Sequence, residues 1–226
     1  METKSHIKHH EDHHSHSLYD EIICHLPYAI FSVAAALTVM SFVMTFDDTI
    51  LFSAAEKKRL DILFHCFHFM HIVFAATGTM LTFMRYSKNI IAGLFVGFFS
   101  PAFFCMLSDA ILPYAGGMLF GVEMEWHLCF TSEIHNVLPF LVVGILNGIV
   151  MSQHHSSKQG LYSVFSHFIH ILVSSLASTF YIVSHGFSDW YSSIGYLFLF
   201  LIGAVVVPCT LSDVVVPMII AKGRNL

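Results

Sequence analysis

The sequence predicts an all-α, polytopic membrane protein with six transmembrane helices. Of its 226 residues, 56% are hydrophobic and only 11% are charged, and the mean hydropathy is +0.71. Soluble domains average about 25% charged residues, so this composition excludes a water-soluble globule. The apolar residues form six segments, each near or above the ~20 residues that span a bilayer. These segments cover residues 26–46, 62–84, 90–120, 134–152, 161–183 and 192–221.

The third and sixth segments are too long for one straight span, and each contains two prolines. Proline removes a backbone hydrogen bond from a helix, so we expect both helices to be kinked or broken there. Lipid tolerates such a break only where the freed backbone groups face protein or a cavity. The prolines are Pro101 and Pro113 in the third segment, and Pro208 and Pro217 in the sixth.

A polar segment precedes the first span. Residues 1–21 contain six of the 17 histidines and show no apolar periodicity. This composition is typical of a flexible, low-complexity segment that binds metal ions. We expect low-affinity metal binding there, chiefly by His9, His10, His13 and His14.

The charge distribution excludes one class of partner and predicts an orientation. The net charge is −5 and the basic residues are scattered, so the chain lacks the electrostatic footprint of a nucleic-acid-binding protein. Placing both termini in the cytoplasm puts seven basic residues on the inner side and three on the outer side, as the positive-inside rule favours. We therefore expect a multi-pass protein of the inner or plasma membrane with a mildly acidic outer face. The sequence does not determine the oligomeric state, and a homo-oligomer is one of the alternatives.

The chain contains an internal repeat. Helices one and four, two and five, and three and six share motifs in the same order, which is the signature of duplication. A unit of three helices has its ends on opposite sides of the membrane, so the second copy must be inverted. The halves are residues 22–122 and 133–226. The motifs are E-I-x-x-x-L-P from Glu21 and Glu133, H-F-x-H-I from His68 and His167, and C-x-L-S-D-x-x-x-P from Cys105 and Cys209.

Inverted repeats with broken helices at corresponding positions are typical of transporters whose site lies at the repeat interface. The alternative is that the duplication only produced a stable bundle, because a fold alone does not establish a function.

Two intramembrane aspartates are the strongest single signals. An aspartate at the centre of a membrane helix costs roughly 2.5–3.5 kcal/mol, so Asp109 and Asp213 should face a partner, an ion or a cavity. Pro113 and Pro217 should free the carbonyls of these two aspartates, because proline cannot donate to the residue four positions earlier. Four residues before each aspartate, on the same helix face, are Cys105 and Cys209.

Two pairs of histidines are candidate metal ligands. His68 and His71, and likewise His167 and His170, lie three residues apart and share a helix face, so each pair can converge on one ion. Imidazole together with carboxylate favours a transition metal. Two histidines and an aspartate, with an optional cysteine, supply enough ligands for a metal site. The repeat supplies this set twice, so the halves either hold separate sites or share one.

Other residues allow two interpretations. His25 and His65 have no counterpart in the other half and are as well explained as hydrogen-bonding struts between helices. His127 and His135, near the acidic outer loop, are either an outer collecting site or solvated loop residues, and the second is the simpler interpretation. The repeated cysteines can also pack as small hydrophobic residues.

The leading hypothesis is a secondary transporter of a divalent transition-metal cation of the zinc, iron, nickel, cobalt or manganese class. Protons could be the coupling ion, because metal ligands must lose protons to bind. One alternative is a membrane haem protein that transfers electrons, with histidines as axial ligands. Another is an intramembrane metal-dependent hydrolase. No GxSxG motif occurs, and the one HExxH string, His10 to His14, lies in the polar segment 1–21 rather than in an apolar span, so we expect a transporter rather than an enzyme.

Overall fold

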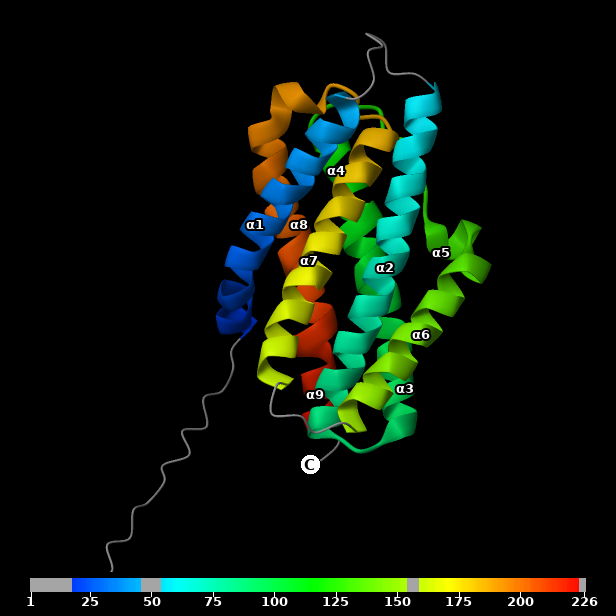
Figure 1. Ribbon diagram of the computed structural model, residues 1–226, viewed down its shortest axis with the longest axis vertical. Coiled ribbons are helices and arrows are strands. Elements are labelled where there is room, and N and C mark those ends of the chain that lie inside the picture. The colour runs from blue at the N-terminus through cyan, green and yellow to red at the C-terminus, as the bar shows by residue number, and fades with distance from the viewer. Residues whose placement is uncertain (1–17, 46–53, 154–158, 224–226) are drawn as a thin grey trace, which may run out of the picture.

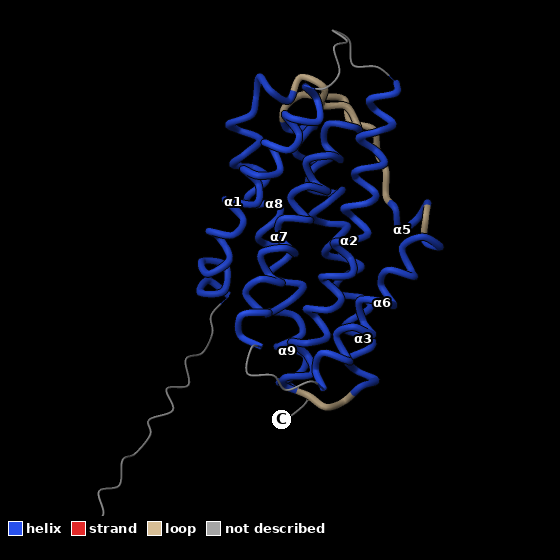
Figure 2. The backbone as a smooth tube through the Cα atoms, viewed as in Figure 1, coloured by secondary structure: helices blue, strands red, loops and turns tan. Residues whose placement is uncertain are grey.

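The computed structural model describes residues 18–45, 54–153 and 159–223, and this part of the chain is helical without strands (Figures 1 and 2). The α-helices are α1 (Leu18–Thr45), α2 (Ala54–Tyr86), α3 (Ile90–Met106), α4 (Leu112–Leu119), α5 (Cys129–Ser132), α6 (Ile134–Gln153), α7 (Gln159–Ser184), α8 (Ile194–Thr210) and α9 (Val216–Gly223). Two π-helical turns, η1 (Leu107–Ile111) and η3 (Leu211–Val215), and a 3-10 turn, η2 (Trp190–Ser193), complete the described elements.

Six helical stretches are long and apolar enough to cross a membrane, which confirms the predicted number. Their bounds lie close to those of the predicted segments, because long apolar runs are the clearest signal a sequence carries. α1 begins at Leu18, so the end of the range 1–21 is helical, and the histidines of that range lie outside the described residues. The stretches are Ile22–Thr45, Ala54–Tyr86, Ile90–Leu119, Ile134–Gln153, Ser166–Ser184 and Trp190–Gly223.

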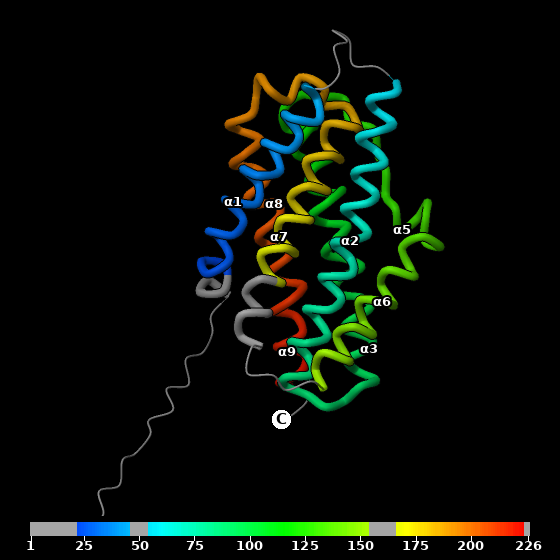
Figure 3. Tube along the Cα trace, viewed as in Figure 1, coloured from blue at the N-terminus to red at the C-terminus, as the bar shows by residue number. Residues whose placement is uncertain are grey.

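The helices run alternately between two ends of an elongated bundle (Figure 1). α1 begins and α9 ends at one end, which we call the terminal end. α2 begins and α7 ends at the opposite end, which we call the distal end. Figure 3 shows α7, from the second half of the chain, lying beside α2, from the first half. The two halves therefore meet along these two helices.

α7 is the central helix. It packs against α1, α2, α4, α8 and the π turn η1. In the most apolar 18 residues of this helix, 72% are buried, whereas at most 44% are buried in the corresponding part of each of the other five stretches. Its buried face carries hydroxyls rather than only hydrocarbon, with Ser174, Ser175, Ser178 and Thr179 all fully buried. These hydroxyls of α7 thus face the inside of the bundle.

The outside of the bundle is apolar. Phe31, Phe95 and Leu199 expose 70%, 63% and 68% of their surface, and many other large apolar side chains are also exposed. Water-soluble proteins rarely expose large contiguous apolar patches. An apolar exterior around a polar interior is the arrangement expected where lipid surrounds the bundle.

Small residues let α6 approach α2 closely. A Cβ atom on Gly144 would lie 2.6 Å from the Val73 carbonyl oxygen, and one on Gly148 would lie 2.9 Å from the Thr77 carbonyl oxygen. The Thr77 hydroxyl also lies 3.1 Å from the Gly144 carbonyl oxygen, to which it donates. Close approach at glycine with interhelical hydrogen bonds is how membrane helices pack without a hydrophobic driving force. This packing positions α2, which carries three of the histidines discussed below.

Candidate metal centre

Asp109 and Asp213 lie in the two π-helical turns, η1 and η3, which occur at the same motif within the third and sixth helical stretches. In each turn a backbone N–H donates to the carbonyl five residues earlier, from Leu112 to Leu107 and from Val216 to Leu211. Single π turns inside α-helices are often found at functional sites. Both aspartates are buried inside the bundle.

The π register changes which carbonyls lose a donor. In an α-helix, Pro113 and Pro217 would leave the carbonyls of the two aspartates without an N–H donor. In the π register, the partner of each proline is instead the residue five positions earlier, namely Ser108 and Ser212. The carbonyls without an N–H donor are therefore those of the serines, one residue before the aspartates that the sequence analysis predicted. The prediction assumed α-helical spacing, whereas these turns are π-helical.

Hydroxyl groups from neighbouring helices donate to these two carbonyls. The Ser178 hydroxyl of α7 lies 3.0 Å from the Ser108 carbonyl oxygen and 2.8 Å from the Ser174 carbonyl oxygen of its own helix, so its one hydrogen is shared between them. The Thr79 hydroxyl of α2 lies 2.9 Å from the Ser212 carbonyl oxygen. The freed backbone groups are thus bonded within the protein, as a membrane interior requires. They are not available as metal ligands.

Asp109 is surrounded by hydrogen-bond donors. Its Oδ2 lies 2.9 Å from Nδ1 of His68 and 2.6 Å from Nδ1 of His71. Its Oδ1 accepts from the hydroxyls of Ser108 at 2.6 Å and Ser174 at 2.9 Å. Four donors satisfy both carboxylate oxygens, so the buried charge is well compensated.

Asp213 has a sparser environment. Its Oδ2 lies 2.6 Å from Nδ1 of His170. Its Oδ1 is buried and has no hydrogen-bond partner among the described residues. The aspartates of the two halves are therefore equivalent in sequence and in their contact with one histidine, but not in the rest of their surroundings.

His71 and His170 bring the two halves together at one point. Their Nε2 atoms lie 2.8 Å apart. The Sγ atom of Cys209 lies 3.6 Å from Nε2 of His71, and that of Cys105 lies 3.8 Å from the same nitrogen. The ligand atoms of the two histidines and Cys209 are all within 4.8 Å of one another. We call His71, His170, Cys105 and Cys209 the central cluster; each is at most 5% exposed.

The hydrogen bonds of the two imidazoles determine where their lone pairs point. Each ring donates Nδ1–H to an aspartate, His71 to Asp109 and His170 to Asp213. If both rings were neutral, two bare Nε2 lone pairs would face each other at 2.8 Å. A single hydrogen shared between the two Nε2 atoms would remove this repulsion. A metal ion bound to both nitrogens would take the place of this proton.

The nitrogen–sulfur distances of the central cluster match a metal site with nitrogen and sulfur ligands, and its nitrogen–nitrogen distance is shorter than such a site requires. Tetrahedral zinc, with bonds of about 2.0–2.1 Å to nitrogen and 2.3 Å to sulfur, places ligand nitrogens about 3.3 Å apart and nitrogen and sulfur about 3.6 Å apart. The two nitrogen–sulfur distances meet this value within about 0.2 Å. The nitrogen–nitrogen distance must open by about 0.5 Å. The aspartates occupy the outer positions that orient metal-bound histidines in proteins.

The two repeated histidine pairs differ in their contacts. His68 contacts Asp109 through Nδ1, beside the central cluster. His167 lies one turn from His170, but its ring packs edge-on against that of His25, with the ring centres 4.9 Å apart. The structure thus brings His68, His71, His170, both aspartates and both cysteines to one region, and places His167 outside it.

A second group of possible ligands, not selected by the sequence analysis, lies nearer the distal end. His65 of α2, His127 of the loop before α5, and Cys129 of α5 have their ligand atoms within 4.8 Å of one another. The sequence analysis left two interpretations for each: His65 as a ligand or a strut between helices, and His127 as part of an outer collecting site or a solvated loop residue. The spacing of His65, His68 and His71 at three-residue intervals was the available signal.

The groups around this second cluster have shifted pKa values. The pKa of Glu133 is lowered, because the Asn136 side chain donates to its carboxylate and histidines lie nearby. Burial lowers the pKa of His127, and the neighbouring His65 lowers it further. Burial raises the pKa of the Cys129 thiol. A neutral imidazole beside an ionised carboxylate is the form in which both can bind a metal.

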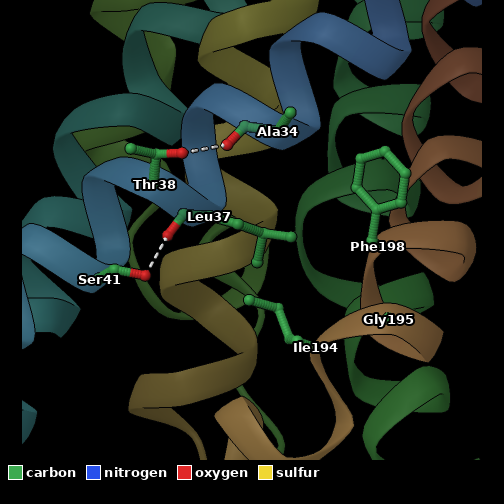
Figure 4. Close-up of a pocket in the computed structure, with 7 residues that line it drawn as sticks. All are labelled: Ala34, Leu37, Thr38, Ser41, Ile194, Gly195 and Phe198. Carbon is green, nitrogen blue, oxygen red and sulfur yellow. Dashed lines mark hydrogen bonds between the residues drawn. The ribbon is translucent and has the colours of Figure 1, made fainter.

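A surface pocket of about 330 Å³ between α1 and the start of α8 is unrelated to these clusters (Figure 4). It is lined mainly by apolar side chains, and its two hydroxyls are bonded within their own helix. Thr38 donates to the Ala34 carbonyl at 2.8 Å and Ser41 to the Leu37 carbonyl at 2.9 Å. The pocket is lined by no histidine, aspartate or cysteine among the described residues.

Comparison of the chain with protein-family models, with curated proteins and with solved structures found no match.

Proposed function

We propose that the protein is a secondary transporter of a divalent transition-metal cation, bound at the central cluster and shared by two inverted three-helix repeats. The observation that carries this proposal is the contact between His71 and His170. These residues occupy the same position in the repeated motif, and their Nε2 atoms meet at 2.8 Å. Of the two arrangements that the sequence left open, this contact supports one shared site.

The placement of the cluster supports transport rather than a purely structural role. In transporters built from inverted repeats, the substrate site lies between the repeats, at discontinuous helices. Here the ligands come from α2 and α7, where the halves meet, and from the segments beside η1 and η3. Rocking of one half against the other would expose the ion first to one side and then to the other. In the proposed orientation, both termini are cytoplasmic.

The donor set favours particular cargo. Imidazole nitrogens with cysteine sulfurs suit zinc best, and iron, cobalt and nickel next, whereas manganese prefers oxygen ligands. A fourth ligand from Cys105 would complete a tetrahedral arrangement. Within the class of metals expected from the sequence, we therefore place zinc first.

Proton movement accompanies binding in this proposal. The hydrogen between the two Nε2 atoms must leave when a metal ion binds both nitrogens. Asp109 and Asp213 hold the rings in place through Nδ1 and balance the charge of the bound ion. Metal movement in one direction would thus be linked to proton movement in the other.

The two alternative functions receive less support from the same geometry. Two axial haem ligands would have to face each other across the iron, whereas the two Nε2 atoms are in direct contact at 2.8 Å. A hydrolytic metal site needs an open position for water. The three ligand atoms grouped within 4.8 Å come from His71, His170 and Cys209, so it is a further ligand from Cys105 that would close the centre to water.

The test is metal flux in liposomes containing the full-length protein, with a zinc indicator and a pH indicator trapped inside. We expect zinc influx coupled to proton efflux, and a loss of at least about tenfold in His170→Ala, because ligand removal weakens binding by at least as much as removal of a supporting group. His167→Ala is the matched control, since it removes the same side chain one turn away and should keep flux. Equal flux in both variants would exclude the central cluster as the substrate site. Absence of zinc, iron, cobalt, nickel and manganese flux in the wild type would exclude the function.

A further inference from the structure

The cluster nearer the distal end has the geometry of a second metal site. His65 Nε2 lies 3.2 Å from His127 Nε2, and the Cys129 Sγ atom lies 3.7 Å from the same His127 nitrogen. A tetrahedral site with nitrogen and sulfur ligands requires about 3.3 Å and 3.6 Å for these two distances. Both observed values lie within about 0.1 Å of the requirement, without any movement of the chain.

A carboxylate lies beside these three ligand atoms, next to His65. Oε1 of Glu133 lies 3.4 Å from Nε2 of His65. Zinc accepts carboxylate oxygen at about 2.0–2.2 Å, which places that oxygen about 3.4 Å from a ligand nitrogen. Two nitrogens, one sulfur and one oxygen are a donor set that zinc-like cations accept and that calcium and magnesium do not favour.

Contacts around the cluster orient its ligands. Nδ1 of His65 donates to the Asp61 carbonyl at 2.7 Å, which leaves Nε2 with its lone pair facing His127. The Tyr181 hydroxyl binds the main chain of His127 on both sides, accepting from its N–H at 3.2 Å and donating to its carbonyl at 3.1 Å. The loop that carries His127 is thus attached to α7. Such supporting contacts are typical of metal sites in which the ligands are held in place.

The neighbouring loops are also joined. The Glu125 N–H donates to the His185 carbonyl at 2.7 Å, so the chain before α5 is bonded to the chain after α7. A Cβ atom on Gly186 would lie 2.5 Å from the Glu123 carbonyl oxygen, and this glycine has φ +142°, so the approach requires glycine. The chain between α4 and α5 passes beside α2 in Figure 1.

We propose that His65, His127, Cys129 and Glu133 form a second binding site for a zinc-like divalent cation, separate from the central cluster. This binding does not depend on transport. If the site also binds the ion before it reaches the central cluster, that role rests on the proposed function. Along α2, His65 and His71 are six residues apart, which is about 9 Å of helix, with His68 midway. An ion would therefore pass from the second site to the central cluster along one helix.

The experiment is a titration of the full-length protein in detergent with Co²⁺, followed through the absorption band of cobalt bound to cysteine sulfur. Residues 1–21 contain histidines but no cysteine, so metal bound there does not contribute to this band. The variant Cys105→Ser/Cys209→Ser removes the sulfur ligands of the central cluster and should retain a band that saturates at a single equivalent. Adding Cys129→Ser should abolish this band. Zinc should displace the cobalt.

Two controls separate binding from unfolding. Cys66→Ser replaces an exposed cysteine that follows His65 directly, and its band should equal that of the wild type. His127→Ala in the Cys105→Ser/Cys209→Ser background should weaken cobalt binding by more than about tenfold without removing the sulfur. Thermal unfolding of each variant without metal reports whether it is folded.

The outcomes are distinct. Loss of the band in a folded Cys105→Ser/Cys209→Ser variant would overturn the second site, as would a band that persists after Cys129→Ser is added. The central cluster is judged separately, from the single variant Cys129→Ser. If that variant shows no band while Cys105→Ser/Cys209→Ser does, the second site stands and metal binding at the central cluster fails.

Discussion

Replacing Gly78 by alanine should weaken metal binding at the central cluster without altering any ligand. A Cβ atom at this position of α2 would lie 2.5 Å from Oδ2 of Asp213, the oxygen that contacts His170. Ordinary contact begins near 3.4 Å, so the oxygen must move by about 0.9 Å. A hydrogen bond of 2.6 Å tolerates no such lengthening, because the normal range ends near 3.2 Å.

The expected magnitude follows from the role of Asp213. Removing a group that orients a metal-bound histidine costs about 10- to 100-fold in metal affinity. This corresponds to about 1.4–2.8 kcal/mol of binding free energy. The assay is competition between the protein and a zinc chelator of known affinity, read through displacement of cobalt from the cysteine-linked band. A Gly78→Ala protein that is folded and binds with wild-type affinity would refute the positioning role of Asp213.

Two glycines provide matched controls for this experiment. At Gly203, in the exposed part of α8, a Cβ atom would meet nothing within 4 Å, so alanine there should leave metal affinity unchanged. At Gly144, a Cβ atom would lie 2.6 Å from the Val73 carbonyl, so alanine should lower stability by disturbing the contact between α6 and α2. Gly144→Ala should lower the unfolding temperature while the folded fraction keeps its metal affinity. This pattern separates a packing defect from a defect at the cluster.

Two further predictions concern polar groups inside the bundle. Ser178→Ala removes the donor to the Ser108 carbonyl and should lower the free energy of unfolding by about 0.6–1.7 kcal/mol. Ser175→Ala, which removes a hydroxyl bonded only within α7, should cost less in the same denaturation assay, and an equal cost would contradict the account of the π turn. Asp109→Asn should lower the thermal unfolding temperature of the metal-free protein more than Asp213→Asn, because four donors face the first carboxylate and one histidine the second. A larger decrease for Asp213→Asn would show that these hydrogen bonds do not determine stability.

Some of the candidate site could be predicted from local spacing. Asp109 and Asp213 are carboxylates within long apolar segments, where such groups are rare, and both are buried in the bundle as expected. His68 and His71 share a helix face, and both contact Asp109. Such predictions succeed because helical periodicity places residues three or four positions apart on one side. The same reasoning predicts nothing about which other helix that side will face.

Other parts depended on contacts between distant segments. His167 and His170 have the same spacing as the pair in α2, yet only His170 reaches the central cluster. The difference arises because α1 packs against α7, and its His25 lies against His167. The cluster of His65, His127 and Cys129 joins α2 to a loop more than 60 residues later, and neither motif nor spacing in the sequence marks that contact.

By itself, the sequence determined that the chain forms six apolar helices long enough for a membrane, and that its interior carries paired histidines, aspartates and cysteines. The physical reason is that length and hydrophobicity are properties of single segments. Only the tertiary structure decided that the two halves share one cluster, that the π turns shift the freed carbonyls from the aspartates to the preceding serines, and that a second group of ligands gathers near the distal end. These features depend on which helices become neighbours. That choice is made by the packing of the whole bundle at small residues and buried polar groups.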